Sequence, residues 1–400
     1  MPFTFEALPA RYGDSLFLTF EDGGQVRRML IDAGPATVYE NEVRKRLTAA
    51  KAEAGGELTL DAIMVSHVDE DHILGLLDLF AELQDAEQRR QPWPWDVKWL
   101  LHNSFDALMD EGEGGMARAL GGETLLASLG GTAALSDALG DGREFGHAAE
   151  LVLASYAQGS KLSTLAAALR ITRNPPDGSP ILSADAPRVL KLGAASFIVV
   201  GPRQRELEKL RKAWDKWRET VKAKKKPTAE LAASLDTSVP NLSSIVALLE
   251  HGGAKVLLTG DARSDYIHEG LRAAGLTDAA GKLHLDILKM PHHGSIRNVT
   301  SGFLKKVTAD HYVASGDGTY GNPDRATLEL IEQTRPQGGY TVHLTYDAET
   351  CDGTHDAWRR ARGKGPLDVQ AEGIAPVVER WKQPGSGITV REGPVAIAFA

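Results

Sequence analysis

Four potential metal ligands lie within six residues of this chain, in the segment that runs from His67 to His72. The apolar run 61–66 before it predicts a buried strand, and the apolar residues 73–77 after it predict the first turns of a helix. The ligands His67, Asp69, Asp71 and His72 are therefore expected on a strand-to-helix loop. Such a loop can aim all four side chains at one point, which a continuous helix or strand does only for every second or third residue. This spacing predicts a metal site.

Length and composition favour one large domain that spans residues 1–400. The chain has 42% hydrophobic residues, which is enough for a large core. Its formal net charge of −9 argues against a basic coat, so a contact with nucleic acid would need a local patch. Cys351 is the only cysteine, which excludes an intramolecular disulfide and a cysteine-rich zinc site. With no signal segment or membrane span in the sequence, we expect a soluble, cytoplasmic protein without a membrane partner.

Hydrophobic periodicity predicts strands that alternate with helices, which is typical of an α/β layered fold. We expect helices within 36–55, 265–274 and 324–333, and helical insertions at about 78–185 and 203–240 that cover one side of the core. Strands are expected at 15–20, 26–31, 97–101, 189–192, 196–200, 244–249, 255–259, 285–289, 311–314, 340–346 and 395–400.

Residues 203–226 form a basic segment, with 11 Lys and Arg against 4 Asp and Glu, so its net charge is +7. Apolar residues recur there at helical spacing, which predicts an amphipathic helix with the basic residues outward. Two interpretations stay open for Lys222, Lys224, Lys225 and Lys226: a solvated helix face, or contacts with phosphate groups. Trp214 and Trp217 either pack against the core or stack on bases.

Further ligand-type residues follow two other predicted strands. Asp261 comes after the strand 255–259, and His292 and His293 come after the strand 285–289. Because α/β folds place their sites at the carboxyl ends of strands, we expect these side chains near the His67–His72 loop. Mixed His and Asp ligation suits Zn²⁺, Mn²⁺ or Fe²⁺ better than Ca²⁺ or Mg²⁺. One of the two histidines, preferably His292, is expected to be a ligand, and the other a structural hydrogen bonder or a phosphate contact.

Five ordered segments carry a resemblance to a known family: residues 12–15, 30–34, 66–72, 258–262 and 288–295. With them the sequence resembles the metallo-β-lactamase superfamily and, within it, the ComEC-like branch, which comprises the hydrolase domain of a DNA-uptake competence protein and free-standing relatives. The resemblance implies a four-layered αβ/βα sandwich with two metal ions at one edge, between its two sheets.

The same resemblance implies which residues hold the ions. His67 and Asp69 would hold one ion, Asp71 and His72 the other, and Asp261 would bridge them, while His292 or His293 would complete the shell of the second ion. Asp32 would support the ligands from below through hydrogen bonds. The alternative for Asp32 is a residue that only ends its strand.

Three departures from the family pattern affect the chemistry. Asp69 stands where the superfamily usually has a histidine, as in the ComEC-like branch, which favours harder ions such as Mn²⁺. Asn241 occupies about the place of another expected histidine. Ser295 and Asn322 are expected substrate contacts, but Asn322 replaces a histidine and cannot act as a general acid. Protonation of the leaving group would then fall to water, Lys289 or the spare histidine.

The activity implied is hydrolysis of phosphodiester bonds with two divalent ions, Mn²⁺ or Zn²⁺. Two ions about 3.5–4 Å apart would activate a bridging hydroxide, and Asp71, Asp261 and Lys289 would be catalytic. DNA is the expected substrate, with RNA second. One alternative is a hydrolase of a small molecule such as a cyclic nucleotide, lactone or thioester. Another is an effector subunit of a bacterial defence or toxin-like complex, and a protein partner or a homo-oligomer stays open.

Overall fold

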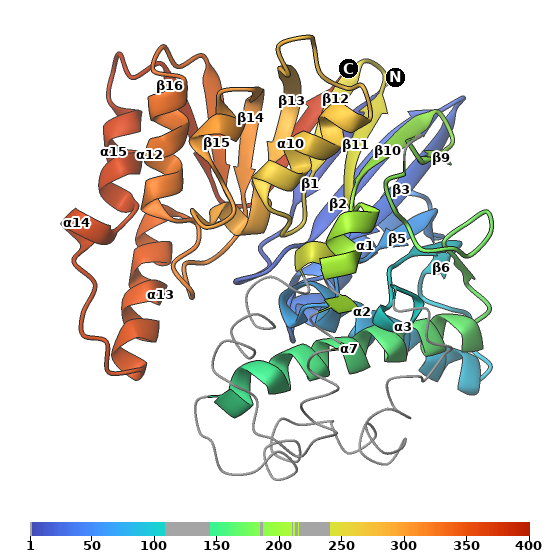
Figure 1. Ribbon diagram of the computed structural model, residues 1–400. Coiled ribbons are helices and arrows are strands. Elements are labelled where there is room, and N and C mark those ends of the chain that lie inside the picture. Colours follow the sequence, from blue (N-terminus) through green and yellow to red (C-terminus); the bar gives the residue numbers. More distant parts are fainter. Residues whose placement is uncertain (1, 109–144, 185–186, 210, 213–214, 216–240) are drawn as a thin grey trace.

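The computed structural model describes residues 2–108, 145–184, 187–209, 211–212, 215 and 241–400. Two sheets form its centre (Figure 1). The seven-stranded sheet has the order β17 (Val395–Phe399), β1 (Phe3–Ala7), β2 (Leu16–Asp22), β3 (Gln25–Ile31), β5 (Ala62–Met64), β7 (Trp99–Leu101) and β8 (Thr172–Arg173). The eight-stranded sheet has the order β16 (Ile388–Glu392), β15 (Tyr340–Leu344), β14 (Val307–Ala314), β13 (Leu283–Lys289), β12 (Ala254–Leu258), β11 (Val246–His251), β10 (Ala195–Gly201) and β9 (Val189–Leu192). The short strands β4 (Thr59–Leu60) and β6 (Asp96–Val97) pair separately.

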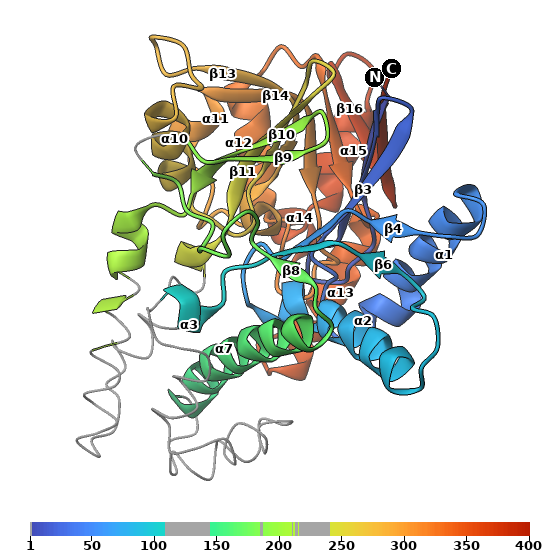
Figure 2. The same ribbon diagram turned by 90° about the vertical axis from the view of Figure 1, so that its right-hand side faces the viewer.

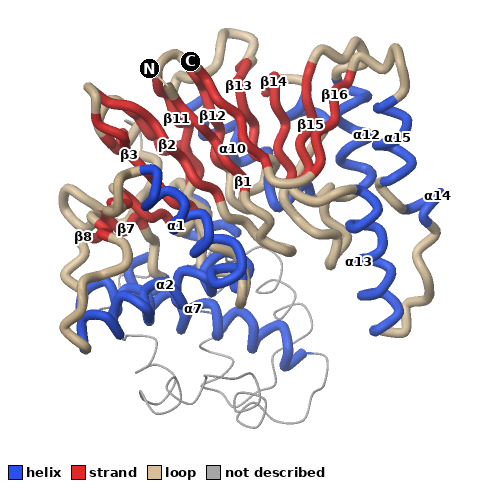
Figure 3. The backbone as a smooth tube through the Cα atoms, turned by 180° about the vertical axis from the view of Figure 1, so that it is seen from behind, coloured by secondary structure: helices blue, strands red, loops and turns tan. Residues whose placement is uncertain are grey.

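Helices pack on the outer face of each sheet (Figure 3). On the seven-stranded sheet these are a π-helical turn (Tyr39–Val43), α1 (Arg44–Glu53), α2 (Glu70–Gln88), α3 (Phe105–Leu108) and α7 (Phe145–Ala168). Beside the eight-stranded sheet lie α10 (Ser264–Ala273), α11 (Ser301–Leu304), α12 (Arg325–Thr334), α13 (Ala348–Ala361), α14 (Val369–Glu372) and α15 (Ala375–Lys382).

The alternation of side chains along the strands produces the layers. On β2, Leu16, Leu18 and Phe20 belong to the core between the two sheets, whereas Phe17 points to the opposite face and packs with the helices. Three buried clusters result: one between the sheets and one under each set of helices. The order helix, sheet, sheet, helix confirms the α/β sandwich that the sequence predicted.

The direction of the strands determines which edge of the sandwich collects the candidate site residues, and we call it the functional edge. The strands from β12 to β16 run parallel to one another, and so do β3, β5, β7 and β8. Their carboxyl ends therefore lie at one edge of each sheet. Because β2 runs antiparallel to β3, its amino end lies at that edge too. At the far end of the fold, β1 pairs with β17 and brings the two termini together (Figure 2).

The expected strands, and the helices expected within 36–55, 265–274 and 324–333, are found with small shifts in their bounds, including the hairpin of β9 and β10. Most of the insertion expected at 203–240 lies outside the described residues. The sequence missed β1, β16, α13 and α15. The range 78–185, expected as a helical insertion, also contains β7 and β8, which extend the seven-stranded sheet. Lys222, Lys224, Lys225 and Lys226 lie outside the described residues, as do Trp214 and Trp217. Within the described part of the chain, none of the helices has the length and apolar character needed to cross a membrane.

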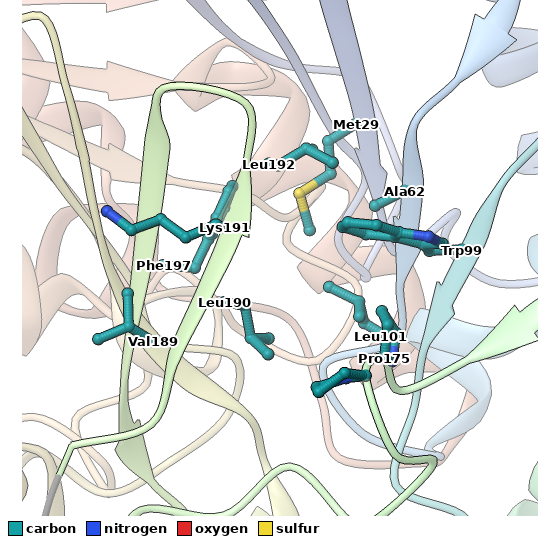
Figure 4. A pocket seen from close by; sticks show the side chains of 11 residues that line it. Met29, Ala62, Trp99, Leu101, Pro175, Val189, Leu190, Lys191, Leu192 and Phe197 are labelled. Carbon is teal, nitrogen blue, oxygen red and sulfur yellow. The ribbon is translucent and has the colours of Figure 1, made fainter.

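An apolar pocket of about 290 Å³ opens between β9 and β10 of one sheet and the β3, β5 and β7 strands of the other (Figure 4). Met29, Trp99, Leu101 and Phe197 line it. The ammonium group of Lys191 points away from Trp99 and Met29 in this view. The lining therefore offers an ion or a phosphate no ligand, and the pocket is separate from the cluster described next.

Candidate metal centre

Six chain segments converge at the functional edge, each at the end of a strand. Asp14 precedes β2, Asp32 follows β3, and the segment from Ser66 to His72 follows β5. Asp261 follows β12, and Ser315 follows β14. His292 and His293 follow β13. These short connections bring together side chains that are up to about 300 residues apart in the sequence, as in the contact between Asp14 and Ser315.

The two carboxylate oxygens of Asp261 face different histidines. Oδ1 lies 3.4 Å from Nε2 of His72 and 3.7 Å from Nε2 of His293. Oδ2 lies 3.7 Å from Nε2 of His67 and 3.4 Å from Nδ1 of His292. Asp261 thus stands between two pairs of imidazole nitrogens.

Each pair of histidines has its own second carboxylate. Asp69 Oδ2 lies 3.4 Å from Nε2 of His67. Asp71 Oδ2 lies 3.2 Å from Nε2 of His293 and 3.6 Å from Nε2 of His72. The first ligand group is therefore His67, Asp69, His292 and Oδ2 of Asp261. The second ligand group is Asp71, His72, His293 and Oδ1 of Asp261.

Three of these atoms are buried and lack a hydrogen-bond partner among the described residues: Nε2 of His67, Nε2 of His72 and Oδ1 of Asp261. A buried polar atom without a partner costs about 1–3 kcal/mol, so such atoms are rare unless they serve a ligand. Divalent cations would satisfy these atoms: one in the first ligand group beside His67, and one in the second beside His72 and Oδ1 of Asp261. The cluster therefore fits divalent metal ions, and its mixture of imidazole and carboxylate suits them.

Asp32 contacts His72 on the side of its ring that faces away from Asp71 and Asp261. Its Oδ2 accepts a hydrogen bond of 2.9 Å from Nδ1 of His72 and one of 2.6 Å from the hydroxyl of Ser66. Its Oδ1 accepts from the backbone N–H of Ser66 at 2.7 Å. With the proton fixed on Nδ1, the lone pair of Nε2 points toward Asp71 and Asp261. Burial favours the neutral ring, but the carboxylates of Asp71 and Asp261 raise the pKa of His72 well above its usual value.

His293 is held in a similar way through Asp14. Its Nδ1 donates to the hydroxyl of Ser315 at 3.0 Å, and that hydroxyl donates to Asp14. The other oxygen of Asp14 lies 2.8 Å from the ammonium group of Lys289. Burial opposes ionisation of Asp14, but the positive charge of Lys289 and contacts with His293 keep the pKa of Asp14 far below its usual value. Asp14 is therefore an ionised support for His293.

Asp14, His72, Asp261 and His293 each offer one atom within 4.8 Å of the others. Asp14 differs from the other three, because both of its oxygens already have partners in Lys289 and Ser315. We therefore assign Asp14 to the support of the ligands and not to the ligands themselves.

His292 and His293 point to opposite sides of Asp261, although they are adjacent in the chain. Both have left-handed backbone conformations, with φ of 48° and 56°, and their ring planes differ by 86°. His293 is 1% exposed and lies beside Asp71, where the sequence preferred His292. His292 instead joins the side of His67.

Asn241 lies next to His292, with its side-chain amide 3.2 Å from Nδ1. Since the lone pair of Nδ1 serves one partner at a time, a bound ion would replace this hydrogen bond. Asn241 therefore lies at the first ligand group.

The remaining predicted residues lie around the centre. Lys289 is 1% exposed and donates to the backbone carbonyl of Met290 as well as to Asp14. Ser295 is buried and ends the turn that carries the two histidines. Asn322 is half-buried in the loop between β14 and α12. Lys289 is thereby placed without access to a substrate, and Ser295 is nearly as buried.

The sequence did not single out three supporting residues: Asp14, Ser66 and Ser315. Asp14 and Ser66 lie in the segments that carry the family resemblance, 12–15 and 66–72, but neither segment indicates which partner its side chain has. The partners of Asp14 come from β13 and β14, at the other end of the chain. Only the packing of the two sheets brings them together.

Comparison with known proteins supports the family for part of the chain. Residues 11–93 match the family model of the metallo-beta-lactamase superfamily, a range that contains Asp14, Asp32 and the His67–His72 segment. No curated protein matches the sequence. The match and the four-layered sandwich support the metallo-β-lactamase superfamily, which implies a metallo-hydrolase.

Comparison with solved structures finds weak similarity to three proteins. A diphosphatase from the PhnP family has 13% identity and a TM-score of 0.37, with 100% of this chain and 98% of that chain covered. The metallo-beta-lactamase fold protein YhfI from Bacillus subtilis has 12% identity and a TM-score of 0.37, with 100% of both chains covered. A beta-lactamase domain protein from Burkholderia ambifaria has 13% identity and a TM-score of 0.27, with 65% of this chain and 52% of that chain covered. At these values the similarity says nothing about activity.

Proposed function

We propose that this protein is a two-metal hydrolase of phosphodiester bonds and that its substrate is a nucleic acid. The observation that supports this proposal is the position of Asp261, whose two oxygens face two separate ligand groups. A shared carboxylate between two sets of ligands is the arrangement that two-metal phosphoesterases and nucleases use. The ions, when bound, supply Lewis acidity toward the oxygens of a phosphate group.

The protein residues orient and shield this chemistry. Asp32 and the pair of Asp14 and Ser315 keep the protons of His72 and His293 on Nδ1, so that both Nε2 atoms face the centre. Lys289 neutralises the buried charge of Asp14. Because Lys289 is paired and buried, we assign protonation of the leaving group to solvent and give Lys289 a supporting role.

Each ligand group combines two imidazole nitrogens with two carboxylates. This balance suits Mn²⁺ as well as Zn²⁺, since carboxylate oxygens favour Mn²⁺ and imidazole favours Zn²⁺. Asp69, in the place of a usual histidine, supplies the extra oxygen of the first group and favours the ComEC-like branch of the superfamily.

The proposal is tested with protein that is first stripped of metal and then supplied with Mn²⁺, Zn²⁺ or Mg²⁺. Turnover of bis(4-nitrophenyl) phosphate and cleavage of labelled DNA and RNA are measured for the wild type and for Asp71→Ala. Asp85→Ala is the matched control, because Asp85 is exposed on the same helix α2, about 20 Å from Asp71. We expect metal-dependent turnover that Asp71→Ala abolishes and Asp85→Ala retains. If no metal supports turnover, or if Asp71→Ala is as active as the wild type, the proposal fails.

A further inference from the structure

A row of aromatic side chains lies beside the candidate metal centre. The rings of Tyr12 and Tyr320 have centroids 5.0 Å apart, and those of Tyr320 and Trp358 are 5.8 Å apart. Both contacts are edge-to-face. Three segments supply the row: the loop before β2, the loop after β14, and helix α13, which the family resemblance in the sequence did not cover.

The row is tied to the metal ligands through the backbone. Gly13, next to Tyr12, packs so closely on Asp71 that a Cβ there would lie 1.9 Å from the Asp71 carbonyl oxygen. The N–H of Asp14 donates to that same oxygen at 3.2 Å. The negative charge of Asp71 acts on both tyrosines: burial raises the pKa of Tyr12 to about 12 and also that of Tyr320, and Asp71 contributes to both increases.

The loop that carries Tyr320 is held in place at its start and in its middle. At its start, Ser315 contacts His293, and Gly316 lies close to the Cβ of that histidine. In its middle, Gly318 packs on the backbone of Cys351 in α13 and accepts a hydrogen bond from the N–H of Gly321 at 2.8 Å. Tyr320 itself is 54% exposed. A large aromatic side chain is thus presented to solvent on an ordered loop next to the centre.

Cations accompany the row. The guanidinium of Arg11 lies 5.2 Å from the ring centroid of Tyr12, and Arg362 and Lys364 each lie 4.5 Å from that of Trp358. All three cations are exposed, and none forms an ion pair with a described carboxylate. These three cations can contact phosphates along the row, whereas the carboxylates of Glu70 and Asp71 act on the tyrosines from the side of the centre.

Resting on the proposed function, we propose that this row binds a single-stranded nucleic acid and leads it to the metal centre. Exposed aromatic rings stack on bases, and bases are free to stack only where the strand is unpaired. Tyr320 stacks on a base, while Arg11, Arg362 and Lys364 contact the phosphates on either side. A double helix keeps its bases inside and offers the row only phosphates.

Equilibrium binding in EDTA tests this inference apart from catalysis. Fluorescence anisotropy is recorded with a labelled single-stranded 12-mer of DNA, its RNA counterpart, the DNA duplex, and an abasic strand of equal length. The wild type is expected to bind the single strands more tightly than the duplex or the abasic strand. The difference in affinity between the DNA and RNA strands identifies the preferred sugar.

The variants separate stacking from charge. Tyr320→Ala weakens binding of the base-containing strand by about 5- to 100-fold and leaves the abasic strand unchanged, while Tyr320→Phe retains wild-type affinity. Arg362→Glu with Lys364→Glu weakens both strands and lowers the salt slope by about 1.4, because each phosphate that is no longer neutralised reduces the slope by roughly 0.7. Lys282→Glu is the charge control, because Lys282 precedes β13 and so lies at the opposite end of that strand from His293.

The outcomes distinguish this inference from the proposed function. The role of the row is overturned if the protein binds duplex and single strand equally, or if Tyr320→Ala binds the base-containing strand as tightly as the wild type. It is also overturned if Lys282→Glu loses as much affinity as the variant with Arg362→Glu and Lys364→Glu. If binding follows the expected pattern but no metal supports hydrolysis of a diester, the proposed function fails and the binding row stands.

Discussion

Nε2 of His293 lies 3.2 Å from a carboxylate oxygen of Asp71, although 222 residues separate the two. Asp71 lies in the first turn of α2, which follows β5 of one sheet, and His293 lies in the turn after β13 of the other. The contact therefore spans the two halves of the sandwich at its functional edge. A metal ion held by both residues would link the two sheets, so metal binding should be coupled to the stability of the whole fold.

Replacing Asp32 by Asn should weaken metal binding by about 10- to 100-fold. The amide would offer an N–H to Nδ1 of His72, which favours the opposite tautomer and directs a proton toward the centre. The backbone is not disturbed, because Asn tolerates the φ of 56° at this position. Isothermal titration with Mn²⁺ or Zn²⁺ measures the change.

The control for Asp32→Asn is Asp61→Asn. Asp61 is also buried and accepts hydrogen bonds from Arg27 and Lys98, away from the centre. Asp61→Asn should reduce stability and leave metal affinity intact. Equal metal affinity in Asp32→Asn and the wild type would show that Asp32 only ends its strand.

Gly13→Ala should destabilise the protein by about 1–3 kcal/mol, because its Cβ would overlap the carbonyl oxygen of Asp71. The loop would have to move away from the metal ligands, so metal affinity should fall as well. Gly302→Ala is the matched control, since no atom lies within 4 Å of a Cβ at Gly302. Urea unfolding of the two variants measures the difference, and equal stability would contradict the close packing at Gly13.

Lys289→Met should cost about 3–5 kcal/mol of folding stability, because it leaves the carboxylate of Asp14 buried without its cation. Adding Asp14→Asn removes that charge and should recover part of the loss. A catalytic acid would behave differently: its replacement would reduce turnover and leave stability unchanged. Thermal unfolding of the single and double variants, measured beside diester turnover, decides between these roles.

His102 should make the protein less stable in acid. Burial lowers the pKa of His102 to about 4, and its Nε2 donates to the carbonyl of Gly159. In the unfolded chain this histidine takes up a proton near pH 6.5, whereas the folded protein resists protonation down to about pH 4. The stability due to the neutral ring is therefore complete above pH 6.5 and is lost as the pH falls toward 4.

His102→Gln keeps a donor for Gly159 but cannot titrate. Between pH 7 and pH 4.5 the wild type should lose about 2–3 kcal/mol more than this variant in urea unfolding. His284→Gln, at an exposed histidine, should follow the wild type. Parallel losses in all three proteins would contradict the assignment to His102.

The sequence predicted much of the fold, and it indicated candidate ligands that the structure brings together. Apolar periodicity predicts the strands, and Asp261 and the His67–His72 segment directly follow two of them. The family match over residues 11–93 supports the superfamily, whereas the ComEC-like branch, two ions and a nucleic-acid substrate remain proposals. Helix α13 was not predicted, and its buried residues are only Ala348, Cys351 and Asp352.

The grouping of the ligands could not be predicted, because it depends on backbone geometry and distant packing. Adjacent histidines in a turn give no signal of which side each ring takes, and only the left-handed conformations of His292 and His293 separate them. The support from Asp14 depends on Lys289 and Ser315, which reach it across the two sheets.

The number of metal ions bound per chain tests the central claim most directly. Equilibrium dialysis against Mn²⁺ or Zn²⁺, followed by elemental analysis, should give two ions for the wild type. His67→Ala and His72→Ala should each retain one ion, because each variant damages a different ligand group, and Asp261→Ala should lose both. A wild type that binds no ion, or an Asp261→Ala variant that still binds two, would contradict a two-metal centre shared through Asp261.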